Sequence, residues 1–101
     1  MAVVPYPMRE GTLFVLRGIY ESAGDSVLTY RHRRDSVSFL ELGSVTVDHH
    51  GDVQTYIAPA LIPIKADKHY RITALLDYTI VACVHHLEAG ETHPPVYGKE
   101  D

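Results

Sequence analysis

The chain has 101 residues, of which 46% are hydrophobic and 22% charged, and its formal net charge is −4. This length suits one domain with a single core, and the composition excludes a largely disordered chain. The acidic balance excludes the basic surface of a nucleic-acid-binding protein. No apolar run approaches the roughly 18 residues of a membrane span. We therefore expect neither nucleic acid nor membrane as a partner.

Cys83 is the single cysteine of the chain, so no internal disulfide can form. It lies in an apolar run, which favours a buried and unreactive thiol. The N-terminus lacks the basic start and long apolar region of a secretory signal. Together these features predict a cytoplasmic protein, in the host cytoplasm if the protein is viral.

Glycine, proline and Asp-containing turns recur about every ten residues, and runs rich in Val, Ile, Thr, Tyr and Leu lie between them. This pattern predicts an all-β domain, a sandwich or a barrel, with at most one turn of helix. We expect a flanking N-terminal arm at 1–10, the barrel at 11–88 and a flexible C-terminal tail at 89–101. The predicted strands, in chain order, are 12–17, 27–32, 36–42, 44–49, 53–58, 61–65, 70–75 and 78–85.

Three local features refine these strands. Gly51 supplies the positive φ that a tight hairpin between 44–49 and 53–58 often needs. Pro63 cannot donate to a strand ladder, so the segment 61–65 is predicted at a sheet edge or a strand start. The segment 78–85 is apolar on both faces apart from Thr79, so we expect both faces to be covered, the outer one by a second sheet or a partner subunit. A homodimer or higher homo-oligomer is the expected state.

Two stretches resemble the metal-binding motifs of the cupin family. Residues 30–45, YRHRRDSVSFLELGSV, resemble the first motif, in which a His-x-His pair ends a strand and a glycine closes the next turn. Residues 64–75, IKADKHYRITAL, resemble the second motif, a tight turn followed by a histidine. The layout resembles the short single-domain cupin-like proteins of bacteriophages. The resemblance implies a small jelly-roll β-barrel with a site in its interior.

The resemblance also implies a divalent metal, iron, manganese or zinc, but the ligand set is degenerate. Tyr30 stands where the first histidine should be and His32 matches the second, with Ser36 near the third position and Asp35 beside it. In one register of the second motif the last ligand is His69, and in the other it is Tyr70. Tyrosine can ligate ferric iron, so both registers stay open. With His32 and His69 as the best ligands, the set is incomplete, and we expect no cofactor.

A pocket can persist without its metal. Alternation along a strand places Tyr30, His32 and Arg34 on one face, a set that suits a polar or anionic small molecule. The remaining residues predicted to line the pocket are Tyr70, Phe39 and Tyr56. Alternatively, the basic run 31–34 is a solvated strand end. His85 and His86 are adjacent and face opposite ways, which favours a role at the rim of the barrel for one of them.

Two hypotheses for the function follow. The first is a non-catalytic domain that binds a small polar or anionic molecule in the barrel, with sequestration of a host signalling molecule as a conceivable phage role. The alternative is a metal-dependent cupin enzyme, such as a small oxygenase or isomerase. A third possibility, a structural protein without a working pocket, would require a cavity too small for any ligand.

Overall fold

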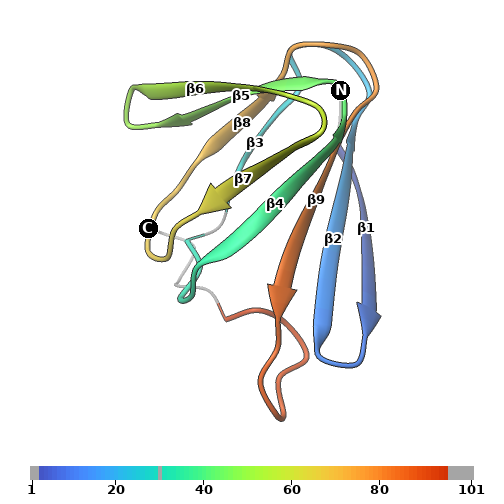
Figure 1. Cartoon of the computed structure of the whole chain (residues 1–101), viewed down its shortest axis with the longest axis vertical. Coiled ribbons are helices and arrows are strands. Elements are labelled where there is room, and N and C mark those ends of the chain that lie inside the picture. Colours follow the sequence, from blue (N-terminus) through green and yellow to red (C-terminus); the bar gives the residue numbers. More distant parts are fainter. Residues whose placement is uncertain (1–2, 30, 96–101) are drawn as a thin grey trace.

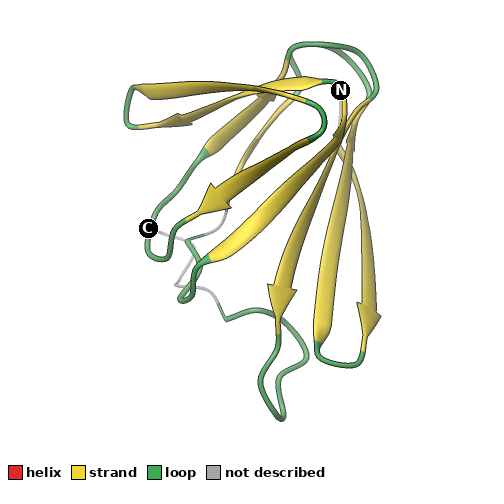
Figure 2. Cartoon of the chain, viewed as in Figure 1, coloured by secondary structure: helices red, strands yellow, loops and turns green. Residues whose placement is uncertain are grey.

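A computed structural model describes residues 3–29 and 31–95 of the chain. This part of the chain is built of strands and loops and contains no helix (Figure 2). It therefore has no helix that could cross a membrane. The strands are β1 (Val3–Glu10), β2 (Leu13–Tyr20), β3 (Ser26–Leu28), β4 (Ser36–Leu42), β5 (Ser44–His49), β6 (Asp52–Ile57), β7 (Ala60–Ile64), β8 (Arg71–Ala74) and β9 (Thr79–His86).

The strands form two antiparallel sheets that face each other (Figure 1). The larger sheet has the order β1-β2-β9-β4-β7 and the smaller one the order β3-β8-β5-β6. Apart from the β1–β2 and β5–β6 hairpins, every connection carries the chain from one sheet to the other, so neighbouring strands often come from distant parts of the sequence. This double-layered arrangement is a jelly roll, and the all-β barrel predicted from the sequence is confirmed.

Alternation along the strands separates the inner faces from the outer ones. The inner face of each sheet supplies the core, whose members include Leu40 and Ile62 on the larger sheet and Val45 and Ile72 on the smaller. The outer face of the smaller sheet carries a row of hydroxyl side chains running across it from Ser26, with the exposed Val53 and Ile57 on β6 to either side of this row. The smaller sheet therefore has the one wet face that its alternating sequence predicted.

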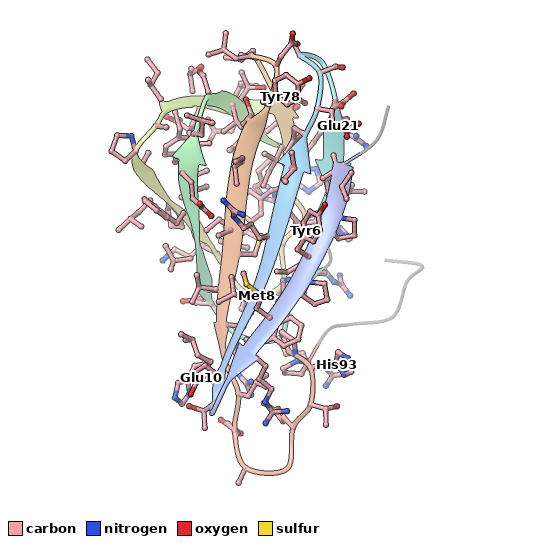
Figure 3. The ribbon with its side chains drawn as sticks, turned by 90° about the vertical axis from the view of Figure 1, so that its right-hand side faces the viewer. Tyr6, Met8, Glu10, Glu21, Tyr78 and His93 are labelled. Atoms are coloured by element: carbon pink, nitrogen blue, oxygen red, sulfur yellow. The ribbon has the colours of Figure 1, made fainter. Side chains whose placement is uncertain are left out.

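The outer face of the larger sheet is mostly apolar. One row runs across all five strands in register, namely Tyr6, Arg17, Ala82, Phe39 and Leu61. Its neighbour is wholly apolar: Met8, Val15, Val84, Val37 and Pro63. Figure 3 shows Tyr6 and Met8 following one another along β1. Several of these side chains are exposed, among them Tyr6 at 49% and Leu61 at 65%.

Two glycine turns define strand boundaries. Gly43 is the one residue between β4 and β5, where the chain leaves the larger sheet for the smaller, and its φ is +90°. At the β5–β6 hairpin, His50 and Gly51 both have positive φ, which is the signature of a type I′ turn. The hairpin predicted from Gly51 is confirmed, and so are the bounds of β4 and β5.

The N-terminal segment differs from its prediction. Residues 1–10 were expected to form an arm, yet Val3–Glu10 pairs along its whole length with β2. Pro5 and Pro7 hid this strand, because proline is rare in strand sequences. The two prolines are two residues apart, so both imide nitrogens point to the same side. Since β1 is an edge strand, that side can be the open one, where no donor is needed.

Pro63 also lies in an edge strand. Strand β7, which contains it, lies at the opposite edge of the larger sheet, as the sequence predicted. Strand β9 lies between β2 and β4, with Val81 buried on its inner face and Ala82 on its outer face, and the predicted cover over that outer face stays a prediction. Strand β3 is shorter than predicted and ends at Leu28, so Thr29, Arg31 and His32 lie beyond the strand.

Candidate functional site

A cavity of about 340 Å³ opens between the inner faces of the two sheets. Its walls are mostly apolar, and they combine residues from both sheets and from the segment after β9. The lining residues are Phe14, Leu16, Val27, Leu28, Thr29, His32, Ser36, Ser38, Ile64, Cys83, His85, His93 and Pro94. A volume of this size with a few polar groups in an apolar wall suits a small organic molecule.

Two histidines meet at one wall of this cavity. The ring centroids of His32 and His85 are 4.6 Å apart. His32 Nδ1 is buried and makes no hydrogen bond within the described residues. Burial lowers the pKa of His32. Burial, with the nearby His32 and Arg34, lowers the pKa of His85 to about 4. Both rings are therefore neutral at pH 7, and each offers one donor and one acceptor.

A smaller pocket of about 170 Å³ adjoins the cavity and shares His32, His85 and Pro94 with it. Most of its other lining residues are charged or polar, and Arg34 is one of them. The Arg34 guanidinium binds both carboxylate oxygens of Glu91, with NH2 to Oε1 at 2.6 Å and NH1 to Oε2 at 3.2 Å. The His32–His85 pair thus divides an apolar chamber from a charged one.

Residues 87–95, which we call the strap, continue from β9 and contribute walls to both pockets. Figure 1 shows this segment at the lower end of the molecule, turning back from β9 towards the start of β4. It is held at its start by Leu87, which is fully buried and whose N–H donates to the Thr12 carbonyl at 2.6 Å. Arg34 holds its middle, and the Arg33 N–H donates to the Pro95 carbonyl at its end. His93 and Pro94 face the cavity between these anchors.

The lowered pKa of His85 predicts a loss of stability in acid. Above pH 6.5 the ring is neutral in both folded and unfolded chains, and the full stability is present. As the pH falls from 6.5 to about 4, the unfolded chain takes up the proton and the folded one does not, so stability declines. Because the ring is partly exposed, we expect this loss to be about 1–2 kcal/mol.

Urea denaturation at pH 7, 5.5 and 4 measures this loss. His85→Gln should flatten the part of the pH dependence that comes from this ring. His86→Gln is the matched control, since His86 is the next residue on the strand but is exposed. Identical pH dependence in the wild type and His85→Gln would contradict the assignment.

The structure separates the residues that the sequence grouped into a pocket. His32 and Arg34 line the pockets described above, whereas Tyr30 lies outside the described residues. Phe39 is wrongly placed by the prediction: Ser38 and Leu40 on either side of it point inward, so Phe39 lies on the outer face, 38% exposed.

The two tyrosines behave as core residues. Tyr56 pairs with the buried Val45 and packs against the core from β6. Tyr70 is buried in the core, and its hydroxyl accepts a hydrogen bond from the Lys65 N–H at 3.1 Å. Neither tyrosine lines the cavity beside His32.

The predicted metal ligands do not form a metal centre. The His69 ring bonds the Thr29 carbonyl through Nδ1 at 2.9 Å, and His69 lines neither pocket. Within residues 3–29 and 31–95, no three side chains of His, Cys, Asp or Glu come together in a way that could hold a metal ion. The donors that meet at the cavity therefore do not fit iron, manganese or zinc.

Sequence reasoning left Glu91 out of the site and placed only one of His85 and His86 at the rim of the barrel. His85 reaches the cavity because it lies two residues beyond Cys83 on the inner face of β9, a parity that the sequence does show. Phe14 lies opposite His85 on β2, and this pairing follows only from the sheet order. Glu91 lies in the segment predicted as a flexible tail, and no local signal ties it to Arg34.

No protein-family profile matches the sequence, and no curated protein matches it. Solved structures match its fold. A cupin superfamily protein of Desulfitobacterium hafniense aligns with a TM-score of 0.71 and 10% identity over 86% of this chain and 79% of that one. KdgF from Halomonas sp. aligns with a TM-score of 0.72 and 11% identity over 87% and 81%.

A cupin-2 domain-containing protein of Shewanella frigidimarina aligns with a TM-score of 0.66 and 12% identity over 82% of this chain and 79% of that one. At these identities the likeness concerns the fold alone. It agrees with the all-β, two-sheet architecture described above. The chain has the jelly-roll fold of the cupin superfamily, as its motif-like stretches implied.

Proposed function

We propose that the protein is a non-catalytic binding domain for a small organic molecule. The apolar body of the ligand occupies the cavity, and one polar group meets the imidazole of His32. The observation that carries this proposal is the buried Nδ1 of His32, which has no partner among the described residues and lies in a mostly apolar wall. A buried polar atom without a partner costs free energy, which a ligand group would recover.

This ligand is more apolar than the sequence suggested. The polar or anionic molecule expected there relied on Tyr30, His32, Arg34 and Tyr70 facing one pocket. Arg34 is already engaged by Glu91, and Tyr70 belongs to the core. In the setting of the phage-type resemblance, such binding would sequester a host signalling molecule.

Cys83 provides the test. It is the single thiol of the chain, it lines the cavity, and it accepts a hydrogen bond from the Ser38 hydroxyl at 3.2 Å. We expect 1-octanol to bind and to slow the alkylation of Cys83 by iodoacetamide at least fivefold, because a filled cavity excludes the reagent. Intact mass measured over time gives the rate.

Ser36→Phe places a large ring at the cavity wall and should weaken octanol binding at least tenfold, while Ser36→Ala should leave it within about twofold. Equal binding by both variants would contradict the cavity as the site.

Elemental analysis of untagged protein tests the alternative function. A stoichiometric transition metal, whose removal abolishes binding, would favour the metal-dependent enzyme.

We propose further that a second copy of the chain covers the outer face of the larger sheet. Arg17 binds Glu41 there through two hydrogen bonds of 3.0 and 3.1 Å, within a surface of exposed apolar side chains. A two-fold axis passing beside this pair would bring the Arg17 of each copy towards the Glu41 of the other. The apolar surroundings supply the area to be buried.

Light scattering should give twice the mass of the chain. Phe39→Asp, on β4 between Ala82 and Leu61 of this outer face, should yield monomers. Thr55→Asp adds the same charge to the outer face of the smaller sheet and should remain dimeric. A wild-type protein that is monomeric at micromolar concentration would exclude this dimer.

A further inference from the structure

Arg34, which lines the charged pocket beside the cavity, is already bound by a carboxylate of the chain itself. Glu91 binds Arg34 through both oxygens. A second carboxylate, that of Glu88, lies 3.6 Å from the same guanidinium. Arg34 NH2 also donates a hydrogen bond to the His86 carbonyl at 3.2 Å. Both terminal nitrogens of the guanidinium are thus bonded by the end of β9 and the strap.

The Arg34–Glu91 pair is exposed enough to exchange. The Arg34 side chain is 35% exposed and that of Glu91 is 25% exposed. A partly solvated pair of this kind contributes little net stability, because water can replace either partner. Its geometry, however, is that of a bidentate carboxylate site, which is specific for a planar anion of this shape.

The position of this pair next to the cavity gives it a role. The two pockets share His32, His85 and Pro94, so Arg34 lies on the other side of the imidazole pair from the apolar chamber. Resting on the proposed binding function, we propose that the ligand is an organic monocarboxylate with an apolar body. Its carboxylate displaces Glu91 from Arg34, and Glu91 is the internal competitor that the ligand must replace.

This exchange also acts on the strap. Between the anchors at Leu87 and Pro95, Arg34 ties the strap to the barrel through its ion pairs with Glu88 and Glu91. Glu91 Oε1 also accepts the Glu88 N–H at 2.8 Å and so stiffens the strap itself. Loss of the Glu91 contact releases the segment that carries His93 and Pro94 along the cavity wall. Binding of the acid thus loosens this wall of the cavity.

Octanoate and 1-octanol form a matched pair of probes, equal in chain length and different in charge. Calorimetry should give their dissociation constants for the wild type, Glu91→Gln and Arg34→Gln. Glu91→Gln replaces the charged competitor by a neutral one and should tighten octanoate binding about tenfold. Octanol binding should stay within about twofold. Arg34→Gln should weaken octanoate about tenfold and leave octanol unchanged.

Glu21→Gln is the control, since it removes the same charge at the end of the molecule opposite His93 (Figure 3). It should bind both probes as the wild type does. Circular dichroism confirms that each variant is folded.

The outcomes separate this inference from the proposed function. If Glu91→Gln tightens octanol as much as octanoate, or tightens neither, the competition between carboxylates is refuted and the cavity-binding function stands. The same holds if octanol binds and octanoate binds no variant. If neither probe binds any variant, the proposed cavity-binding function itself fails.

Discussion

Replacing Gly43 with alanine is expected to lower the free energy of unfolding by about 3 kcal/mol. Two effects add at this position. The φ of +90° is unfavourable for any residue with a Cβ atom. The added Cβ would also overlap the Thr79 side chain and lie 3.0 Å from the Thr79 Cα.

Thr79 has no room to move away. It is fully buried at the start of β9, and its hydroxyl donates to the Leu76 carbonyl at 2.8 Å. Any shift would disturb the point where the chain passes from the larger sheet to the smaller. The clash must therefore be absorbed by the backbone of both strands, which is why the expected cost exceeds that of a strained turn alone.

Gly51→Ala separates the two effects. Gly51 has a nearly equal φ of +88°, but an added Cβ would meet nothing within 4 Å. We expect it to lose only about 1 kcal/mol, the cost of the backbone conformation. Chemical denaturation of both variants gives the difference, and equal losses would show that contact with Thr79 contributes nothing.

Leu87→Ala is expected to cost about 3 kcal/mol and to loosen the strap. Leu87 is fully buried where β9 ends, so its removal leaves a void and frees the anchor of the following segment. The cavity wall formed by the strap should then open more often. Iodoacetamide should therefore alkylate Cys83 at least fivefold faster than in the wild type. Denaturation and intact-mass kinetics measure the two effects separately.

Leu76→Ala serves as the control for this substitution. The Leu76 side chain is 54% exposed, so its truncation should change stability by no more than about 0.5 kcal/mol. Its alkylation rate should match that of the wild type. A Leu87→Ala protein that is destabilised but alkylated at the wild-type rate would show that the strap does not gate the cavity.

The strands that sequence reasoning placed best are those whose signals are local. The bounds of β4 and β5 follow from alternation and from the glycine between them, and Gly51 defined the next hairpin. Strand β1 was not predicted, for an equally local reason: Pro5 and Pro7 lack the N–H that strand pairing uses. Their tolerance depends on lying at an edge, which is known only once the sheet order is known.

The site was predicted less well, because its contacts join residues that no motif spacing connects. The spacing of the cupin motifs linked His32 to position 69 or 70. In the fold, His32 meets His85, because β9 and the segment after β3 reach the same end of the molecule. The partner of Arg34 is 57 residues further along the chain, in a segment whose composition indicated only a tail.

The prolines at the two borders of the larger sheet limit how molecules can associate. Strand β1 carries Pro5 and Pro7, and β7 carries Pro63, so both borders lack main-chain donors at these positions. A strand from a second molecule could not accept a hydrogen bond from these proline residues, which disfavours intermolecular β-sheets that extend from either edge. Crowded preparations of this protein should therefore remain free of amyloid-like fibres nucleated on that sheet.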